Sequence, residues 1–169
     1  MQELLREMVE TYGNRIYRLA LRYTGNRPQA EDITQETFLK VYQNLDRYDQ
    51  NRPPGPWIFK IATNLCRNWL RDNREIALNF DEETRSANPG PEELYLAQEE
   101  KAELLQAIYR LPEKYREVIM LKHVSELSYN EIAETLNLDL SLVKNRLYRG
   151  RLMLRDSLTK GNGGSVKNE

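Results

Sequence analysis

The sequence predicts an all-α protein of two small helical domains joined by a flexible acidic linker, the second domain being a helix-turn-helix. Apolar residues recur at the i, i+3, i+4, i+7 spacing of amphipathic helices over most of the 169 residues. No segment shows the alternation of polar and apolar residues that indicates strands. Residues 76–94, between the two helical halves, combine acids with Pro and Gly, which is the composition of a tether.

The first half contains three predicted helices. Apolar residues are spaced for a helix over residues 3–23, and "TGNRP" then interrupts the pattern. A second helix follows over residues 30–48, with its acids on the exposed side. The stretch "DQNRPPGP" predicts a tight turn, because its prolines do not extend a helix, and the third helix is expected to follow at Trp57.

The third helix, in "PWIFKIATNLCRNWLRDNRE" (residues 56–75), carries two different stripes. One stripe is apolar and predicts a core face, and the other mixes amides, cations and an aromatic ring. Amides can read base edges, cations neutralise phosphates and an aromatic ring stacks on a base, so the mixed stripe suits unpaired nucleic acid. The alternative is a solvated helix face whose Trp folds back into the core. The apolar stripe is Ile58, Ile61, Ala62, Leu65 and Trp69, and the mixed stripe is Trp57, Lys60, Asn64, Arg67, Asn68 and Arg71.

The second half reads as a helical hairpin followed by a helix-turn-helix. Helical spacing resumes over residues 92–111, stops at Pro112 and returns, with Pro112 expected in the first turn. Ser128 and Glu131 have the spacing of a capping box, which begins a short helix. The helix after "NLDLS" holds five basic residues and no acid between Lys144 and Arg155. Such a helix suits a major groove, although a basic solvated helix is the alternative.

Composition excludes several classes of protein. Hydrophobic residues at 40% and charged residues at 30% are typical of a globular protein, and no apolar run approaches the roughly 18 residues of a membrane span. The amino terminus has no apolar region of a secretory signal, so we expect a cytoplasmic protein without membrane insertion. The charge is uneven: residues 76–100 hold 1 Lys or Arg against 7 Asp or Glu, whereas both flanking segments are mildly basic.

The sequence does not predict an enzyme. It has no glycine-rich phosphate loop and no histidine-rich metal spacing. Cys66 and His123 are each the single residue of their type, which excludes an internal disulfide and a cysteine-based zinc cluster. Cys66 is expected at the edge of the core and His123 in a packing or capping role. We therefore expect neither a cofactor nor a metal.

Three blocks in order carry a resemblance to a known family. "AEDITQETFLKVYQNLDRY", "PWIFKIATNLCRNWLR" and "LPEKYREVIMLKHVSELSYNEIAETLNLDLSLVKNRLYRGRLML" resemble the extracytoplasmic-function (ECF) class of bacterial RNA polymerase sigma factors over nearly the whole chain. The resemblance implies a transcription initiation factor that binds core RNA polymerase and promoter DNA, both duplex and melted. It implies the sigma region 2 domain at residues 1–75, an acidic linker at 76–94, the region 4 domain at 95–160 and a disordered tail at 161–169.

The resemblance also implies three binding surfaces and a regulator. Acids of the second helix would bind core polymerase, the mixed stripe would hold the melted minus-ten region, and the last helix would read the minus-thirty-five element. Many relatives are held inactive by an anti-sigma factor. The polymerase surface is Glu31, Asp32, Gln35 and Glu36; the minus-ten surface is Tyr48, Trp57, Lys60, Asn64, Arg67, Asn68 and Arg71; the minus-thirty-five surface is Ser141, Lys144, Asn145, Tyr148 and Arg149.

The sequence departs from the family at two places. The family usually has Gly-Thr at the start of the recognition helix, where this chain has Ser141 and Leu142. It commonly has Thr or Ser before the Trp, where this chain has Pro56. Two other functions stay open from the residues alone. These are a stand-alone helix-turn-helix regulator of transcription, and a helical interaction protein or regulator of a sigma factor.

Overall fold

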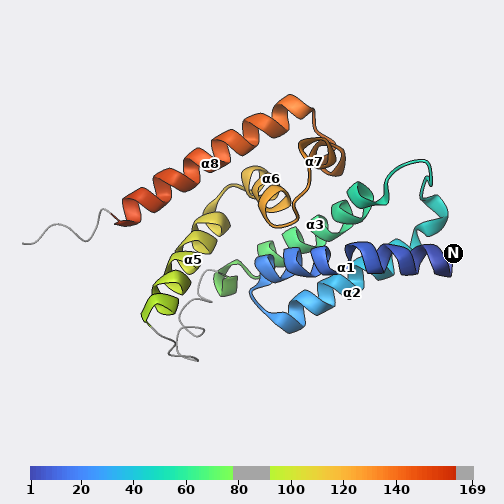
Figure 1. The fold of residues 1–169 in the computed structure, drawn as a ribbon, viewed down its shortest axis with the longest axis horizontal. Coiled ribbons are helices and arrows are strands. Elements are labelled where there is room, and N and C mark those ends of the chain that lie inside the picture. The colour runs from blue at the N-terminus through green and yellow to red at the C-terminus, as the bar shows by residue number, and fades with distance from the viewer. Residues whose placement is uncertain (78–91, 163–169) are drawn as a thin grey trace, which may run out of the picture.

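The computed structural model describes residues 1–77 and 92–162, and within these it describes side chains for residues 1–77 and 101–161. Every regular element in these two ranges is a helix, which confirms the all-α prediction (Figure 1). The elements are α1 (Gln2–Thr24), α2 (Arg27–Gln43), the short 3-10 helix η1 (Leu45–Arg47), α3 (Pro54–Asp72), α5 (Glu92–Arg110), α6 (Glu113–His123), α7 (Tyr129–Leu136) and α8 (Leu140–Asn162).

The helices α1, α2 and α3 pack on one another as a bundle. The sequence "TGNRP" turns the chain between the first two. Gly25 ends α1 in the left-handed conformation, with φ 61°, which glycine adopts at little steric cost. The side chain of Asn26 then caps α2 by accepting a hydrogen bond from the backbone N–H of Gln29 at 3.0 Å.

The prolines before Trp57 belong to α3 itself, and the predicted turn is wrong at this point. The helix begins at Pro54, so Gly55 and Pro56 lie in its first turn. A proline is tolerated there because the first N–H groups of a helix have no partner within the helix. Gly55 lies against Tyr12 of α1, where an added Cβ would stand 3.2 Å from the ring. The close approach of the two helices therefore favours glycine at this position, because a larger residue would require the Tyr12 ring to shift.

The buried face of α3 is rotated relative to the predicted stripe. Ile58 and Ala62 are fully buried as expected, whereas Ile61, Leu65 and Trp69 are only partly buried. Phe59 and Cys66 lie deeper, and both have no exposed surface. Cys66 is thus at the centre of the core, and its predicted place at the edge is wrong. The rotation follows from packing on three sides, because α3 contacts α1, α2 and, from the other half of the chain, α7.

In the second half, α8 packs against α5, α6 and α7. The predicted capping box is confirmed: the Ser128 hydroxyl accepts from the Glu131 N–H at 3.1 Å, and Glu131 accepts from the Ser128 N–H at 2.7 Å. Pro112 stands at the N-cap of α6, one residue before the predicted first turn. Asn137, with φ 53°, ends α7 and turns the chain toward α8.

Two predicted boundaries shift. The helix α5 begins at Glu92, three residues inside the predicted linker of residues 76–94. The helix α8 continues through Asn162, two residues into the predicted tail of residues 161–169. Residues 76 and 77 of the predicted linker are helical as well, and the rest of both segments, residues 78–91 and 163–169, lies outside the described residues.

The two helical halves pack against each other, which the sequence did not predict. Figure 1 shows α6 and α7 between α8 and the bundle of α1, α2 and α3. A single apolar core runs through both halves. The Tyr109 hydroxyl of α5 donates a hydrogen bond to the backbone carbonyl of Arg22 in α1. In the described ranges, no helix is both long and apolar enough to span a membrane.

Candidate nucleic-acid interface

The mixed stripe of α3 begins at an aromatic pair. The Trp57 ring stacks on Tyr48, with ring centroids 4.9 Å apart and planes 16° from parallel. Both side chains are half-buried, so each keeps a free edge or face. Stacked aromatic rings on a surface are the platform on which unpaired bases bind. The sequence predicted both residues for this role, and the structure brings them together from the loop after η1 and from α3.

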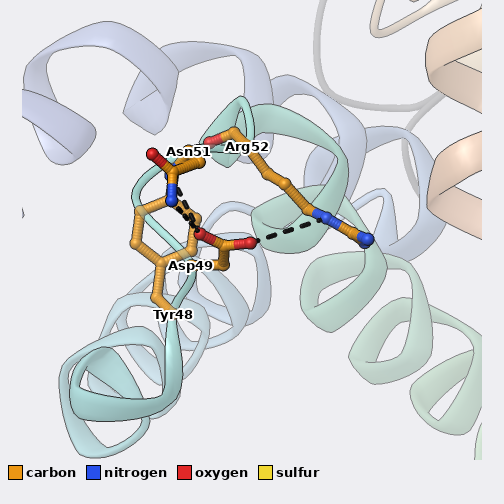
Figure 2. Close-up of polar contacts among 4 residues, drawn as sticks. All are labelled: Tyr48, Asp49, Asn51 and Arg52. Carbon is orange, nitrogen blue, oxygen red and sulfur yellow. Dashed lines mark hydrogen bonds and ion pairs between the residues drawn. The ribbon is translucent and has the colours of Figure 1, made fainter.

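The loop between η1 and α3 holds Tyr48 in place, as Figure 2 shows. The Tyr48 hydroxyl donates a hydrogen bond to the backbone carbonyl of Arg52. Asp49 accepts two hydrogen bonds from Asn51, one from the backbone N–H and one from the side-chain amide, both at 3.0 Å. Asp49 also lies 3.8 Å from the Arg52 guanidinium. The partial burial of Tyr48 raises the pKa of its phenol, so the ring stays neutral.

A hollow of about 300 Å³ opens beside the aromatic pair. Its lining includes Lys60 and two arginines, Arg47 and Arg52, which the sequence reading missed. Both arginines are exposed and flank Tyr48 in the chain, and that flanking was the signal available in "DRYDQNR". Three cations around two stacked rings can hold a nucleic-acid phosphate while a base stacks. The hollow also contains an acid from the second half, Glu134 of α7.

The remaining residues of the mixed stripe differ in their surroundings. Asn64 and Asn68 are exposed one turn apart, and Arg71 is exposed with an ion pair to Asp72 at 3.2 Å. Arg67 is only half-buried and is already engaged. Its Nε lies 2.7 Å from Glu113 Oε1, and its Nη2 contacts Glu117 Oε1. Both acids belong to α6, in the other half of the chain.

The helix α8 presents all five predicted recognition residues on one exposed side. Val143 and Leu147 are buried on the opposite side, as the sequence predicted. Tyr148 is the most exposed of the large hydrophobic residues on α8, at 64%. Arg149 donates a hydrogen bond to the Tyr115 phenol and thereby lowers its pKa. The exposed residues are Ser141, Lys144, Asn145, Tyr148 and Arg149.

The acidic face of α2 is also exposed. Glu31, Asp32, Gln35 and Glu36 all face solvent, and Glu36 pairs with Lys40 at 3.5 Å. Farther along the same helix, Leu39 and Tyr42 are 53% and 54% exposed. The sequence analysis missed these two apolar residues, because it expected charged and polar residues on the exposed side of this helix. Acids beside exposed apolar side chains form a surface suited to a protein partner.

Among the described residues, no group of three or more His, Cys, Asp and Glu is arranged to hold a metal ion. His123 lies near the end of α6, where Arg151 of α8 is 3.3 Å from its Nε2. Burial and the charges of Arg151 and Lys122 lower the pKa of the imidazole. His123 therefore lies where α6 packs against α8.

Comparison with known proteins defines the class of this chain. The family model described as Sigma-70 region 2 matches residues 8–76, and that described as Sigma-70, region 4 matches residues 101–154. These two regions coincide with the two helical halves. The chain is therefore built as a sigma factor of the Sigma-70 type.

A curated relative shows which kind of Sigma-70 factor this chain resembles. The ECF RNA polymerase sigma factor SigW of Bacillus subtilis (strain 168) is 38% identical over 168 residues, covering 93% of this chain and 90% of the relative. The chain belongs to the ECF family of RNA polymerase sigma factors.

Solved structures share the fold. The structure of CnrH in complex with the cytosolic domain of CnrY has a TM-score of 0.73 at 24% identity, and covers 95% of this chain and 90% of that one. The sigma factor RpoE of Bartonella quintana, in complex with the anti-sigma factor NepR, has a TM-score of 0.66 at 21% identity, and covers 94% of this chain and 98% of that one. Both likenesses concern the helical architecture.

Proposed function

We propose that this sigma factor directs core RNA polymerase to a specific set of promoters and helps to open their minus-ten region. The observation that carries the proposal is the stacked pair of Tyr48 and Trp57 beside a hollow lined with cations. Base stacking on such a pair contributes about 1–3 kcal/mol per base, which offsets part of the cost of unpairing. Its mechanism is binding without chemical turnover, so the chain acts as an initiation factor and not as an enzyme.

The minus-ten surface comprises the aromatic pair and the exposed side of α3. Asn64 and Asn68 are suited to base edges because an amide both donates and accepts hydrogen bonds. The cations hold the backbone of the melted strand. We assign to this surface Tyr48, Trp57, Lys60, Asn64, Arg67, Asn68 and Arg71.

The minus-thirty-five surface is the exposed side of α8. Asn145 can pair with adenine, and Lys144 or Arg149 with guanine, in the major groove of duplex DNA. Ser141 and Tyr148 lie on the same side and are suited to phosphate contacts. Because Ser141 and Leu142 differ from the usual family residues, the preferred promoter sequence is expected to differ too.

The domain assignment follows the sequence. We assign residues 1–75 to the region 2 domain and 95–160 to the region 4 domain, to which α5 adds residues 92–94 and α8 adds residues 161–162. The acidic linker and the tail are the predicted segments 76–94 and 161–169 without those residues. Glu31, Asp32, Gln35 and Glu36 of α2 bind core polymerase, and the exposed Leu39 and Tyr42 extend that surface. An anti-sigma factor is the expected regulator, and the site of action is the cytoplasm, where polymerase and promoter DNA meet.

Run-off transcription tests this function. Core RNA polymerase would be incubated with pooled genomic fragments from the source organism, with and without this chain. Discrete new start sites that weaken with Asn64→Ala and with Lys144→Ala would support the proposal. If no start sites appeared and the chain did not bind core polymerase, a stand-alone helix-turn-helix regulator or a helical adaptor would be the better account.

A further inference from the structure

We propose that the region 4 half of this chain inhibits the region 2 half, by placing its own carboxylates over the surface that would hold the melted promoter strand. The inference rests on the proposed function, because it concerns the regulation of that surface. The inhibitory contact is formed by Glu113 and Glu117 of α6 and by Glu134 of α7. We call these three residues the acidic cover.

The acidic cover meets the minus-ten surface at two places on α3. Near the start of α3, Glu134 lines the hollow that also contains Trp57 and Lys60. Two to three turns farther on, Glu113 and Glu117 flank Arg67, with Glu113 Oε1 at 2.7 Å from its Nε. The helix α7 also packs directly on α3. Carboxylates thus stand where DNA phosphates would have to bind.

Arg67 cannot serve both partners at once. Its side chain is 32% exposed, and the Glu117 side chain that contacts it is 8% exposed. A guanidinium that already faces two carboxylates has little capacity left for a phosphate. The strand could reach Arg67 only after α6 moves away. The rest of the stripe, Asn64 and Asn68, stays exposed at the margin of the contact.

The contact is held firmly enough to populate a closed state. Arg15 of α1 donates to the backbone carbonyl of Ser125 through Nε at 3.1 Å and Nη2 at 2.7 Å. Tyr109 of α5 donates to the backbone of α1 at Arg22. Both contacts join α1 to the second half of the chain. The free chain therefore holds its two halves together without a second protein.

The same junction is built to open. Among the described residues, two buried side-chain oxygens at this junction have no hydrogen-bond partner, Tyr23 Oη and Ser125 Oγ. Such atoms are unfavourable when buried and would be hydrated once the halves separate. Glu117 is also unfavourable when buried, because burial raises the pKa of its carboxyl against the opposing effect of Arg67.

Separation of the halves would then accompany assembly of the initiation complex. A closed state keeps the free chain from binding single-stranded DNA, and a partner that binds each half separately favours the open state. The affinity of the free chain for a single strand is lowered by the fraction of molecules that are closed. The acidic cover is thus the residue set whose removal should raise that affinity.

The test compares two charge-matched double variants of the full chain. Glu113→Gln with Glu117→Gln removes the ion pairs to Arg67 and keeps the shape of both side chains. Glu10→Gln with Glu103→Gln removes two exposed acids, one in each half, that form no ion pair with Arg67. Circular dichroism would confirm that both variants fold. Binding would be measured by fluorescence anisotropy, with a labelled 12-nucleotide single-stranded DNA pool of random sequence, in the absence of polymerase.

We expect the cover variant to bind the pool about fivefold more tightly than wild type, the factor that corresponds to the loss of roughly one ion pair. Its radius of gyration in solution scattering should also increase. The control should change neither quantity, apart from the small effect of net charge, which both variants share. Equal affinities for wild type, cover variant and control would overturn the proposal.

Run-off transcription separates this proposal from the function on which it rests. If wild type yields promoter-specific starts with core polymerase and the two double variants bind the DNA pool equally, the initiation function stands and the acidic cover is refuted. If wild type yields no starts, the initiation function fails, and with it the regulatory meaning of the contact.

Discussion

Arg15 and Ser125 join the two halves of the chain across 110 residues of sequence. The Arg15 guanidinium donates two hydrogen bonds to the Ser125 carbonyl and lies over the Phe59 ring, 5.2 Å from its centroid. One side chain of α1 therefore fixes both the core of the first half and the entrance to α7 in the second. This contact predicts that the stability of the two halves is coupled.

Replacing Arg15 should weaken that coupling. Arg15→Gln removes the charge and the cation–π contact and is expected to lower the free energy of unfolding by about 1–2 kcal/mol. Urea denaturation, monitored by circular dichroism, measures this free energy. Arg6→Gln, on the exposed side of α1, is the control and should cost less than about 0.5 kcal/mol, because its ion pair with Glu10 is solvated. Equal losses in both variants would refute a specific role for Arg15.

Trp57 should matter for strand opening and little for stability. Trp57→Ala removes one ring of the stacked pair and is expected to cost about 1–3 kcal/mol of affinity for the melted strand. Trp57→Phe keeps a smaller ring and should lose less. Permanganate reactivity of unpaired thymines at a promoter found by run-off transcription measures opening by the holoenzyme.

A loss of stability without a loss of strand opening would contradict the role of Trp57 in binding the melted strand. If Trp57→Ala opened the promoter as well as wild type but unfolded at lower urea, then Trp57 would be a packing residue. That outcome would restore the alternative that the sequence left open, in which the Trp folds back into the core.

Much of this molecule could be predicted from local sequence signals. The helices and the capping box at Ser128 follow from periodicity and spacing, and both are confirmed. The start of α3 at Pro54 was missed, because prolines that break a helix interior are tolerated in its first turn. The depth of Cys66 was also missed, since helical periodicity gives a face but not what packs on it.

The contact between the halves was beyond the reach of periodicity. Each half has its own helical pattern, and nothing in the spacing of Arg67 or Glu117 indicates that they meet across the chain. Long-range ion pairs depend on how two bundles dock, which no local rule specifies. The polymerase and minus-thirty-five residues lie on exposed faces, whereas Tyr48, Trp57 and Arg67 of the minus-ten surface are half-buried, and the roles of all these residues stay predictions.

Lys144 should contribute a phosphate or base contact in duplex DNA. Lys144→Ala is expected to weaken holoenzyme binding to a promoter fragment and to reduce the slope of log affinity against log salt by about 1. Lys160→Ala, an exposed lysine near the far end of α8, is the control and should leave the slope unchanged. Filter binding over a series of salt concentrations gives both slopes. A slope that changes equally in the two variants would show general charge attraction and no specific contact by Lys144.

Cys66 should be inert in the native state. Its side chain is fully buried, and burial raises the pKa of the thiol far above neutrality, so the reactive thiolate is scarce. A chromogenic disulfide reagent should therefore react slowly with the native chain and rapidly, with one thiol per chain, after unfolding in urea. The rate should follow the fraction unfolded across the urea transition. Rapid labelling of the native chain at low urea would show that α3 separates from the core far more often than its packing implies.

His123 should make the stability of the chain depend on pH on the acidic side of neutrality. Burial, Arg151 and Lys122 lower the pKa of the folded imidazole below its unfolded value, so the folded state disfavours the protonated form. The neutral ring stabilises the fold above the unfolded pKa of about 6.5, and this contribution is lost as pH falls through the folded pKa. His123→Gln removes the titration and keeps a polar side chain. Between pH 7.5 and 5.5 the melting temperature of wild type should therefore fall more than that of His123→Gln, whereas parallel decreases would assign the pH dependence to other titratable groups.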